Sequence, residues 1–138
     1  MDLETSRAKM MAQVDAARLS ALAKAFAWTL EVDSLTAYVE MRPRRLPDRL
    51  YLLRVCFDDF PERAPSYSFV DRVSRQPVES AWPPNVMHSD NGICTPGTRE
   101  FHERLHKSDA QYLWDHEKYT FLSTLTEIHR LTERGIGG

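Results

Sequence analysis

The spacing of the apolar residues changes once along the chain, and this change constrains the fold more than any other feature of the sequence. From Leu3 to about Phe26, apolar residues recur mostly at steps of three and four, as on one face of an amphipathic helix. After Phe26, apolar and polar residues alternate instead, which is typical of half-buried strands. Four such runs follow one another: Trp28–Val32, Ala37–Met41, Tyr51–Phe57 and Tyr67–Val70. The sequence therefore predicts one helix followed by four strands.

Turn-forming residues separate the four runs. The first break is Asp33-Ser34, and the two later breaks, Arg42–Asp48 and Asp58–Pro65, each contain two prolines. No helical segment lies between the strands, so the pattern lacks the βαβ units from which parallel sheets are built. We expect an α+β fold in which the Leu3–Phe26 helix packs on a four-stranded antiparallel meander.

After the last strand the chain forms a long irregular segment and then returns to helix. Asp71–Gly97 has no periodicity and contains four prolines, and loops of this length are usually functional. A polar helix is expected around Arg99–His106. An amphipathic helix from about Glu117 to Glu133 is expected to close the other side of the sheet. The last four residues, Gly135–Gly138, should fray.

Length, charge and cysteine content limit the class of protein. The 138 residues suit one domain, and a formal net charge of −2 excludes the strongly basic surface of a dedicated nucleic-acid binder. Two cysteines are too few for a disulfide framework, and no signal stretch opens the chain. No apolar run approaches the roughly 20 residues that cross a bilayer. We expect a cytoplasmic protein whose partners are neither membranes nor nucleic acids.

The segment Trp82–Cys94 carries the richest chemistry. Cys94 lies in a predicted glycine-bearing loop, where a thiol can ionise and attack, whereas Cys56 lies within an apolar strand, where thiols are usually inert. Asn85 can donate a hydrogen bond to the oxyanion that forms when a thiolate attacks an acyl carbon. His88, six residues before Cys94, either polarises the thiol or is simply solvated. Cysteine together with asparagine suggests acyl transfer, with Cys94, Asn85 and His88 as candidate catalytic residues.

Several short motifs follow one another through the middle of the chain. They are Tyr51–Phe57, Phe60-Pro61, Pro65, Phe69, Pro84-Asn85 and Gly92-Ile93-Cys94. In this order they resemble the ubiquitin-conjugating enzymes, in particular their divergent bacterial relatives. Members of that family carry a strand, a Tyr/Phe-Pro-x-x-x-Pro turn, a strand that reaches a phenylalanine, a His-Pro-Asn element and the thioester cysteine. The steps from Pro61 to Pro65 and from Pro65 to Phe69, four residues each, agree with the family spacing.

The resemblance implies a two-step acyl transfer. Cys94 would accept the C-terminal acyl group of a ubiquitin-like protein from an adenylating activating enzyme and pass it to an amine on a target protein, while Asn85 steadies the oxyanion. Neither step needs a metal or another cofactor. Bacterial members of the family often occur beside an activating enzyme, a ubiquitin-like protein and a deconjugating metalloprotease, with a role in defence against phage, and we expect such partners here.

The chain departs from the family pattern at several positions. Pro83 stands where the family has the histidine of His-Pro-Asn, and Thr95-Pro96-Gly97 follow the cysteine. About ten extra residues precede Trp114, which the resemblance would match to the tryptophan that follows the family's cysteine. These departures leave open whether Asp109, Asp115 or neither orients the acceptor amine.

A second motif indicates a different chemistry. His102-Glu103-Arg104-Leu105-His106 is an H-E-x-x-H sequence, in which two histidines can bind zinc while the glutamate activates water, as in metallopeptidases. The charged Arg104 and Lys107 are unusual in a buried metal site, and Asp115, His116 and Glu117 do not form an obvious third ligand. We therefore favour a solvated helical face whose histidines line the rim of the Cys94 site, with no bound metal. A small zinc peptidase and a non-catalytic binding variant of the conjugating fold remain the alternatives.

Overall fold

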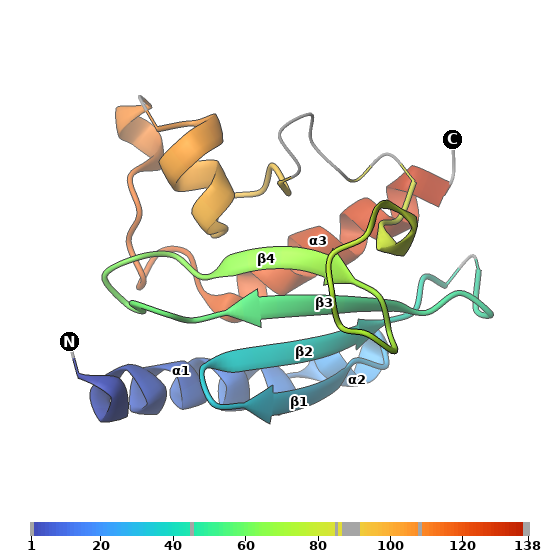
Figure 1. The fold of residues 1–138 in the computed structure, drawn as a ribbon, viewed down its shortest axis with the longest axis horizontal. Coiled ribbons are helices and arrows are strands. Elements are labelled where there is room, and N and C mark those ends of the chain that lie inside the picture. Colours follow the sequence, from blue (N-terminus) through green and yellow to red (C-terminus); the bar gives the residue numbers. More distant parts are fainter. Residues whose placement is uncertain (1, 45, 85, 87–91, 108, 137–138) are drawn as a thin grey trace.

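The computed structural model describes residues 2–44, 46–84, 86, 92–107 and 109–136. Figure 1 shows two N-terminal helices, a sheet, a segment of short helices and one long C-terminal helix. The elements are α1 Leu3–Arg18, α2 Ala21–Ala25, β1 Thr29–Asp33, β2 Thr36–Met41, β3 Tyr51–Cys56, β4 Ser66–Val70, the short helices η1 Glu79–Ala81, η2 Phe101–Leu105 and η3 Ala110–Tyr112, and α3 Phe121–Ile136.

The sheet is the predicted meander. Its strand order is β1-β2-β3-β4, and every neighbouring pair is antiparallel. Leu53 at the centre of β3 pairs with Val39 on one side and with Phe69 on the other, so the buried residues of three strands form one apolar layer. The α+β class and the antiparallel order expected from the alternation are both confirmed.

Both long helices lie on the same face of the sheet, behind it in Figure 1. The core joins Met10 and Val14 of α1 to Leu125 and Ile128 of α3, and the side chain of Gln13 accepts a hydrogen bond from the N–H of Phe121 at 3.0 Å. The expectation that the C-terminal helix closes the other side of the sheet was wrong. Alternating strands offer a single apolar face, and both amphipathic helices bury their stripes there.

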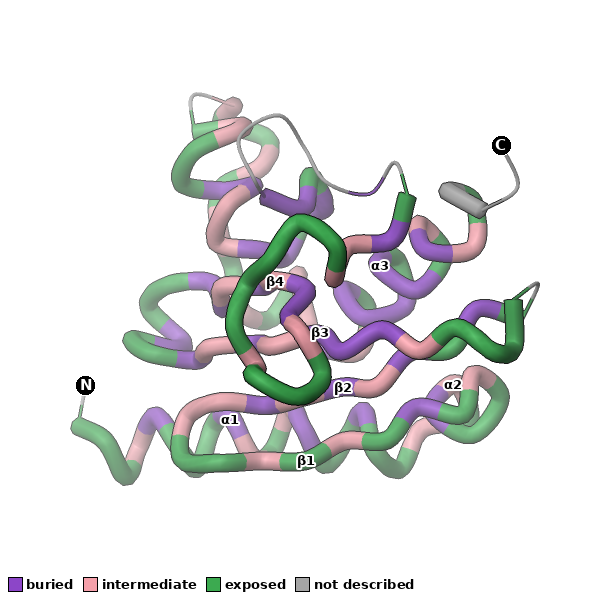
Figure 2. The backbone as a smooth tube through the Cα atoms, turned by 45° about the vertical axis from the view of Figure 1, so that its right-hand side comes forward, coloured by how far each residue is buried: buried purple, intermediate pink, exposed green. Residues whose placement is uncertain are grey.

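The opposite face of the sheet is polar and is partly covered by the irregular segment that follows β4. The Arg75 guanidinium lies 4.2 Å from the centre of the Tyr38 ring and pairs with Glu31 at 2.7 Å. Figure 2 shows this exposed segment crossing in front of the strands. In the described part of the chain, an irregular segment and not a long helix therefore partly covers the second face.

The N-terminal helix is broken where one continuous helix was expected. α1 ends at Arg18, and Ser20 begins α2, with extended backbone and a side-chain oxygen that accepts from the N–H of Ala23 at 3.1 Å. Serine competes for backbone donors in this way and is a favoured N-cap, which explains the break.

The C-terminal helix begins four residues later than expected and ends three residues later. Asp115–Tyr119 form a turn, and α3 starts after Thr120, whose hydroxyl accepts from the N–H of Ser123 at 3.2 Å. The helix continues through Ile136, which shortens the predicted fraying tail, and residues 137–138 lie outside the described ranges. Among the described residues, the longest helices are too short and too polar to cross a bilayer.

Candidate active site around Cys94

Three side chains form a row at the surface. The sulfur of Cys94, an exposed residue, lies 3.5 Å from Nε2 of His106. Nδ1 of the same ring lies 2.7 Å from Oδ2 of Asp109. We call Cys94, His106 and Asp109 the triad. A nucleophile within reach of a base that is itself oriented by a third group is the arrangement of covalent acyl-transfer catalysis.

The carboxylate of Asp109 fixes the direction of the hydrogen bonds in the triad. An ionised carboxylate can only accept, so Nδ1 of His106 carries the hydrogen and donates it to Asp109. In the neutral ring, Nε2 then presents a lone pair, which faces the thiol of Cys94. His106 is therefore placed to receive a proton from this sulfur.

The sequence led us to expect that the Cys94 thiol ionises readily, and the structure indicates the opposite. Neighbouring protein atoms displace water from the sulfur, and this desolvation raises the pKa of the Cys94 thiol above its ordinary value. This shift favours the protonated thiol over the thiolate. The thiol does not ionise simply because it lies in a loop, so attack requires a base such as His106.

The residues on both sides of Cys94 are anchored in the protein. Ile93 and Thr95 are buried, so the chain must present Cys94 between them at the surface. The Thr98 hydroxyl lies 3.0 Å from the carbonyl of Ile93 and accepts from the N–H of Phe101 at 3.1 Å. Thr98 thus fixes the cysteine segment and caps the helical turn that leads to His106.

Gly97 packs against α3 too closely to carry a side chain. Its φ is +107°, and an added Cβ would lie 1.9 Å from Oγ1 of Thr124. Its N–H donates to Nε2 of His102 at 2.9 Å. Glycine is therefore required here both by the backbone conformation and by space.

His102 joins the cysteine segment to the next loop. Because Nε2 accepts from Gly97, Nδ1 holds the hydrogen and donates to the carbonyl of Tyr112 at 2.6 Å. Burial lowers the pKa of His102, which favours this neutral ring. Tyr112 lies three residues after Asp109, so His102 connects the segment of the nucleophile to the segment of the triad carboxylate.

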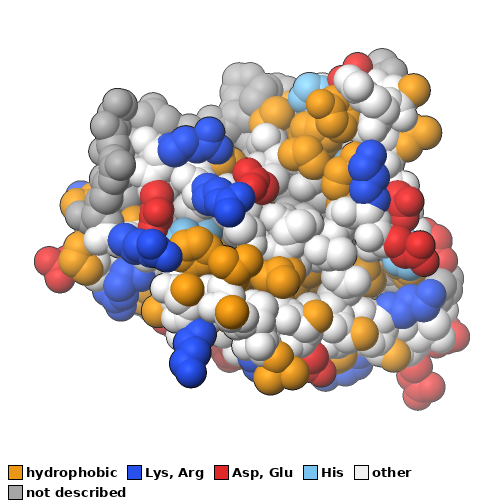
Figure 3. Space-filling view, turned by 180° about the vertical axis from the view of Figure 1, so that it is seen from behind, with side chains coloured by type: hydrophobic (Ala, Val, Ile, Leu, Met, Phe, Trp, Pro, Cys, Tyr) orange, Lys and Arg blue, Asp and Glu red, His pale blue; other side chains and the backbone are white. Residues whose placement is uncertain are grey.

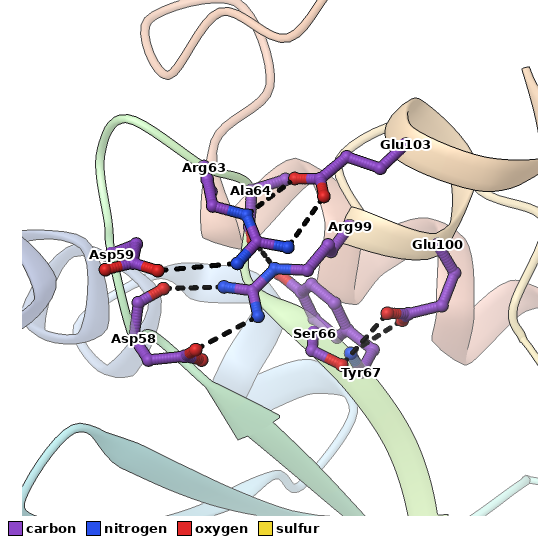
Figure 4. A network of polar contacts seen from close by, with 9 residues as sticks. All are labelled: Asp58, Asp59, Arg63, Ala64, Ser66, Tyr67, Arg99, Glu100 and Glu103. Carbon is purple, nitrogen blue, oxygen red and sulfur yellow. Dashed lines mark hydrogen bonds and ion pairs between the residues drawn. The ribbon is translucent and has the colours of Figure 1, made fainter. Parts of the chain in front are cut away.

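The helical turn Arg99–Leu105 is fastened to the β3–β4 loop by charged side chains, as Figure 4 shows. Arg63 donates two hydrogen bonds to Glu103, at 2.7 and 3.0 Å. Arg99 donates from Nε to the carbonyl of Ala64 at 2.9 Å and pairs with Asp58 at 3.2 Å. His106 directly follows this turn, so the same contacts set where its ring can lie.

Glu100 binds the edge of the sheet. Its carboxylate accepts from the N–H of Tyr67 and from the hydroxyl of Ser66, each at 2.9 Å (Figure 4). Burial raises the pKa of Glu100, while these two donors act in the opposite direction. The contacts hold the base-bearing turn against β4.

The three chemical groups of the H-E-x-x-H motif have partners within the protein. His102 uses both ring nitrogens to bind Gly97 and Tyr112, Glu103 binds Arg63, and His106 belongs to the triad. Across the described ranges, no group of three or more His, Cys, Asp or Glu side chains is arranged to hold a metal ion. The geometry thus favours a role for these residues in building the cysteine site.

The structure brings together only part of the predicted set. Asn85 and His88 lie outside the described residues, so their predicted roles stay predictions. Asp109 joins the site, while Asp115 accepts from the N–H of Glu117 within a turn. His106, the base of the triad, was not predicted from the sequence. The sequence does place His106 three residues before Asp109, a spacing that suits a local hydrogen bond. Such His–Asp pairs are too common for the spacing alone to identify a catalytic base.

Comparison with known proteins finds no family model that matches the chain and no curated protein that matches it. The site is therefore interpreted from its own geometry.

Proposed function

We propose that this chain is a conjugating enzyme of the ubiquitin-conjugating type. It accepts a ubiquitin-like protein from an activating enzyme as a Cys94 thioester and transfers it to an amine on a target protein. The observation that carries this proposal is the triad, in which a surface thiol faces the free lone pair of a carboxylate-bound imidazole.

In the first step, the Cys94 thiol gives its proton to Nε2 of His106 as the sulfur attacks the thioester carbonyl of the loaded activating enzyme. A new bond forms between this sulfur and the acyl carbon, and the bond to the sulfur of the activating enzyme breaks. The departing thiolate takes the proton from the imidazolium, which Asp109 has stabilised. In the second step, the nitrogen of an acceptor amine bonds to the acyl carbon, the bond to the Cys94 sulfur breaks, and the proton lost by the amine passes through Nε2 of His106 to the thiolate. Asn85 remains the predicted donor to the oxyanion.

The fold is consistent with this activity. A helix, a four-stranded meander, a cysteine segment and a C-terminal helix occur in the order that the resemblance implies. The Pro61 motif also binds the segment of Trp114, because Nε1 of Trp114 donates to the carbonyl of Pro61 at 2.8 Å. Chemistry that depends on a free thiol suits a reducing compartment, so the proposal includes the cytoplasmic location.

A protein partner has a surface to dock on near the triad. Leu113, four residues after Asp109, is 66% exposed and lines a surface hollow together with Pro61 and Trp114. Figure 3, seen from behind, shows hydrophobic side chains gathered at the end of the molecule where η2 and η3 lie. Exposed apolar side chains next to a reactive group are typical of protein contacts and support a macromolecular acyl donor.

The test is acyl loading from a chemically made ubiquitin thioester of mercaptoethanesulfonate, followed by intact mass. The wild type and Cys56→Ser should form an adduct that thiols remove, and Cys94→Ala should form none. His106→Gln should load more slowly, by about 10²-fold or more near neutral pH, because the thiol loses its base.

Asp33→Asn is the control and should load like the wild type, because Asp33 is an exposed residue of β1, outside both the triad and the surface hollow. Equal loading of Cys94→Ala and wild type would refute the active site. Absence of loading on the wild type would favour a non-catalytic binding protein.

A further inference from the structure

We infer that the Cys94 thioester is transferred to hydroxyl groups as well as to amines, so that the enzyme makes esters. This inference rests on the proposed function and concerns the acceptor of the same site. The observation that points to it is the complete triad, in which Nε2 of His106 faces the Cys94 sulfur and Nδ1 of the same ring binds Asp109.

The two kinds of acceptor need different help. A lysine ammonium, with an ordinary pKa of about 10.4, becomes a nucleophile once its proton is lost to water or to a nearby carboxylate. A hydroxyl is a much weaker acid and must lose its proton to a base while its oxygen attacks. A carboxylate-backed imidazole is the arrangement with which enzymes deprotonate hydroxyl groups during acyl transfer. An amine acceptor does not require a base of this kind, whereas a hydroxyl acceptor does.

Asp109 is not placed to serve as a simple base for an amine. Its Oδ2 is occupied by Nδ1 of His106 at 2.7 Å. In the described part of the chain, the side chain within hydrogen-bond reach of the Cys94 sulfur is His106, and an acceptor that approaches the acylated sulfur meets Nε2. An imidazole, and not a carboxylate, therefore receives the acceptor's proton.

The ring of His106 is held in position by its neighbours. The ring of Phe101 packs 4.3 Å from it, and the ring of Tyr112 stands edge-on at 5.6 Å. The backbone N–H of His106 also donates to the backbone carbonyl of Phe101 at 2.8 Å. A base whose orientation is fixed in this way can deprotonate an attacking hydroxyl without first being reoriented.

The step is balanced in atoms and charge. The hydroxyl oxygen of the acceptor attacks the acyl carbon, and its proton passes to Nε2 of His106. The bond between the acyl carbon and the Cys94 sulfur breaks, and the thiolate takes the proton from Nε2. The products are an ester, a neutral imidazole and a free thiol, so the step needs no further reactant.

The experiment uses the full chain loaded with ubiquitin from its mercaptoethanesulfonate thioester and freed of excess donor. N-acetylserine and Nα-acetyllysine are added separately, and single-turnover discharge is followed by intact mass. Hydroxylamine identifies esters, because it cleaves them and leaves the amide intact. We expect the wild type to form the N-acetylserine ester. His106→Gln and Asp109→Asn, loaded for longer, should form it more slowly, by about 10²–10⁴-fold for the histidine variant.

Asp33→Asn is the control and should form the ester at the wild-type rate, because Asp33 is an exposed residue of β1 and belongs neither to the triad nor to the surface hollow. Transfer to Nα-acetyllysine without transfer to N-acetylserine would overturn this inference and leave the proposed function intact. An ester rate in His106→Gln equal to that of the wild type would also overturn it. A wild type that cannot be loaded would refute both proposals.

Discussion

Gly97 illustrates how much the cysteine site depends on a residue with no functional group. Its backbone lies in the left-handed region, its N–H binds His102, and its Cα faces the hydroxyl of Thr124 on α3. At this contact between the cysteine segment and the C-terminal helix, a side chain on residue 97 would push the two apart. Cys94 is only three residues earlier, so such a displacement is expected to reach the thiol.

We predict that Gly97→Ala destabilises the protein by more than about 1 kcal/mol, because the new methyl group meets Thr124 and the backbone is strained. Urea unfolding followed by tryptophan fluorescence measures the loss. Gly97→Ala combined with Thr124→Ala should recover only part of it, because removing the hydroxyl relieves the contact and leaves the φ of +107° unchanged. A Gly97→Ala protein as stable as the wild type would contradict this account of the site.

At the scale of elements, Thr98 links the cysteine segment to the helical turn that carries the base. Its hydroxyl accepts from the N–H of Phe101 and donates to the carbonyl of Ile93. One side chain therefore caps the helical turn and fixes the loop that carries Cys94. Thr98 is fully buried, and no water can replace these hydrogen bonds.

Thr98→Ala should cost about 0.5–2 kcal/mol of stability, the usual range for loss of an N-cap. It should also slow loading of Cys94, because the turn that positions His106 loses its start. Thr98→Ser keeps the hydroxyl and should retain most of both properties. Thermal unfolding and the loading assay, measured side by side, test this. Equal losses in Thr98→Ser and Thr98→Ala would show that the methyl group matters more than the hydroxyl.

The elements also show what could be read from the sequence. The ends of the strands were predicted to within one residue, because alternation follows the local burial of the side chains. The break at Ser20 and the late start of α3 were missed, although both rest on local hydroxyl caps. The role of His106 could not be read, because its contact with Cys94 depends on how the turn packs on the β3–β4 loop. The nearer His88 was therefore the natural candidate.

At the scale of the whole molecule, two buried histidines couple stability to pH. His129 on α3 accepts from the indole N–H of Trp28 at 3.0 Å, and the ring of Phe26 stacks on it at 4.1 Å. Burial lowers the pKa of His129 and of His102 below the ordinary 6.5. Both rings are then neutral in the fold and bind protons more readily in the unfolded chain.

Stability should therefore be complete above about pH 6.5 and fall as the pH drops through this value toward the lower pKa values of the fold. The pKa of Glu100 is raised, so protonation of this carboxyl adds stability as the pH falls and opposes the effect of the histidines. A variant of one histidine is therefore needed to measure its share. His129→Gln can still accept from Trp28 but does not titrate, and its urea midpoint should change less between pH 7.5 and 5.5 than that of the wild type. Identical pH dependence of the two proteins would exclude His129 as the cause.

The carboxylate of Glu100 has a consequence for association between chains. β4 is an edge strand, and such edges attract strands from other molecules unless their backbone groups are occupied. Because Glu100 occupies the N–H of Tyr67, a foreign strand that pairs at this point must displace the carboxylate, one of the contacts that hold the turn leading to His106. Association through this edge is therefore expected to disturb the position of His106 and to lower acyl transfer. In a preparation that associates by this route, activity would disappear before the core unfolds.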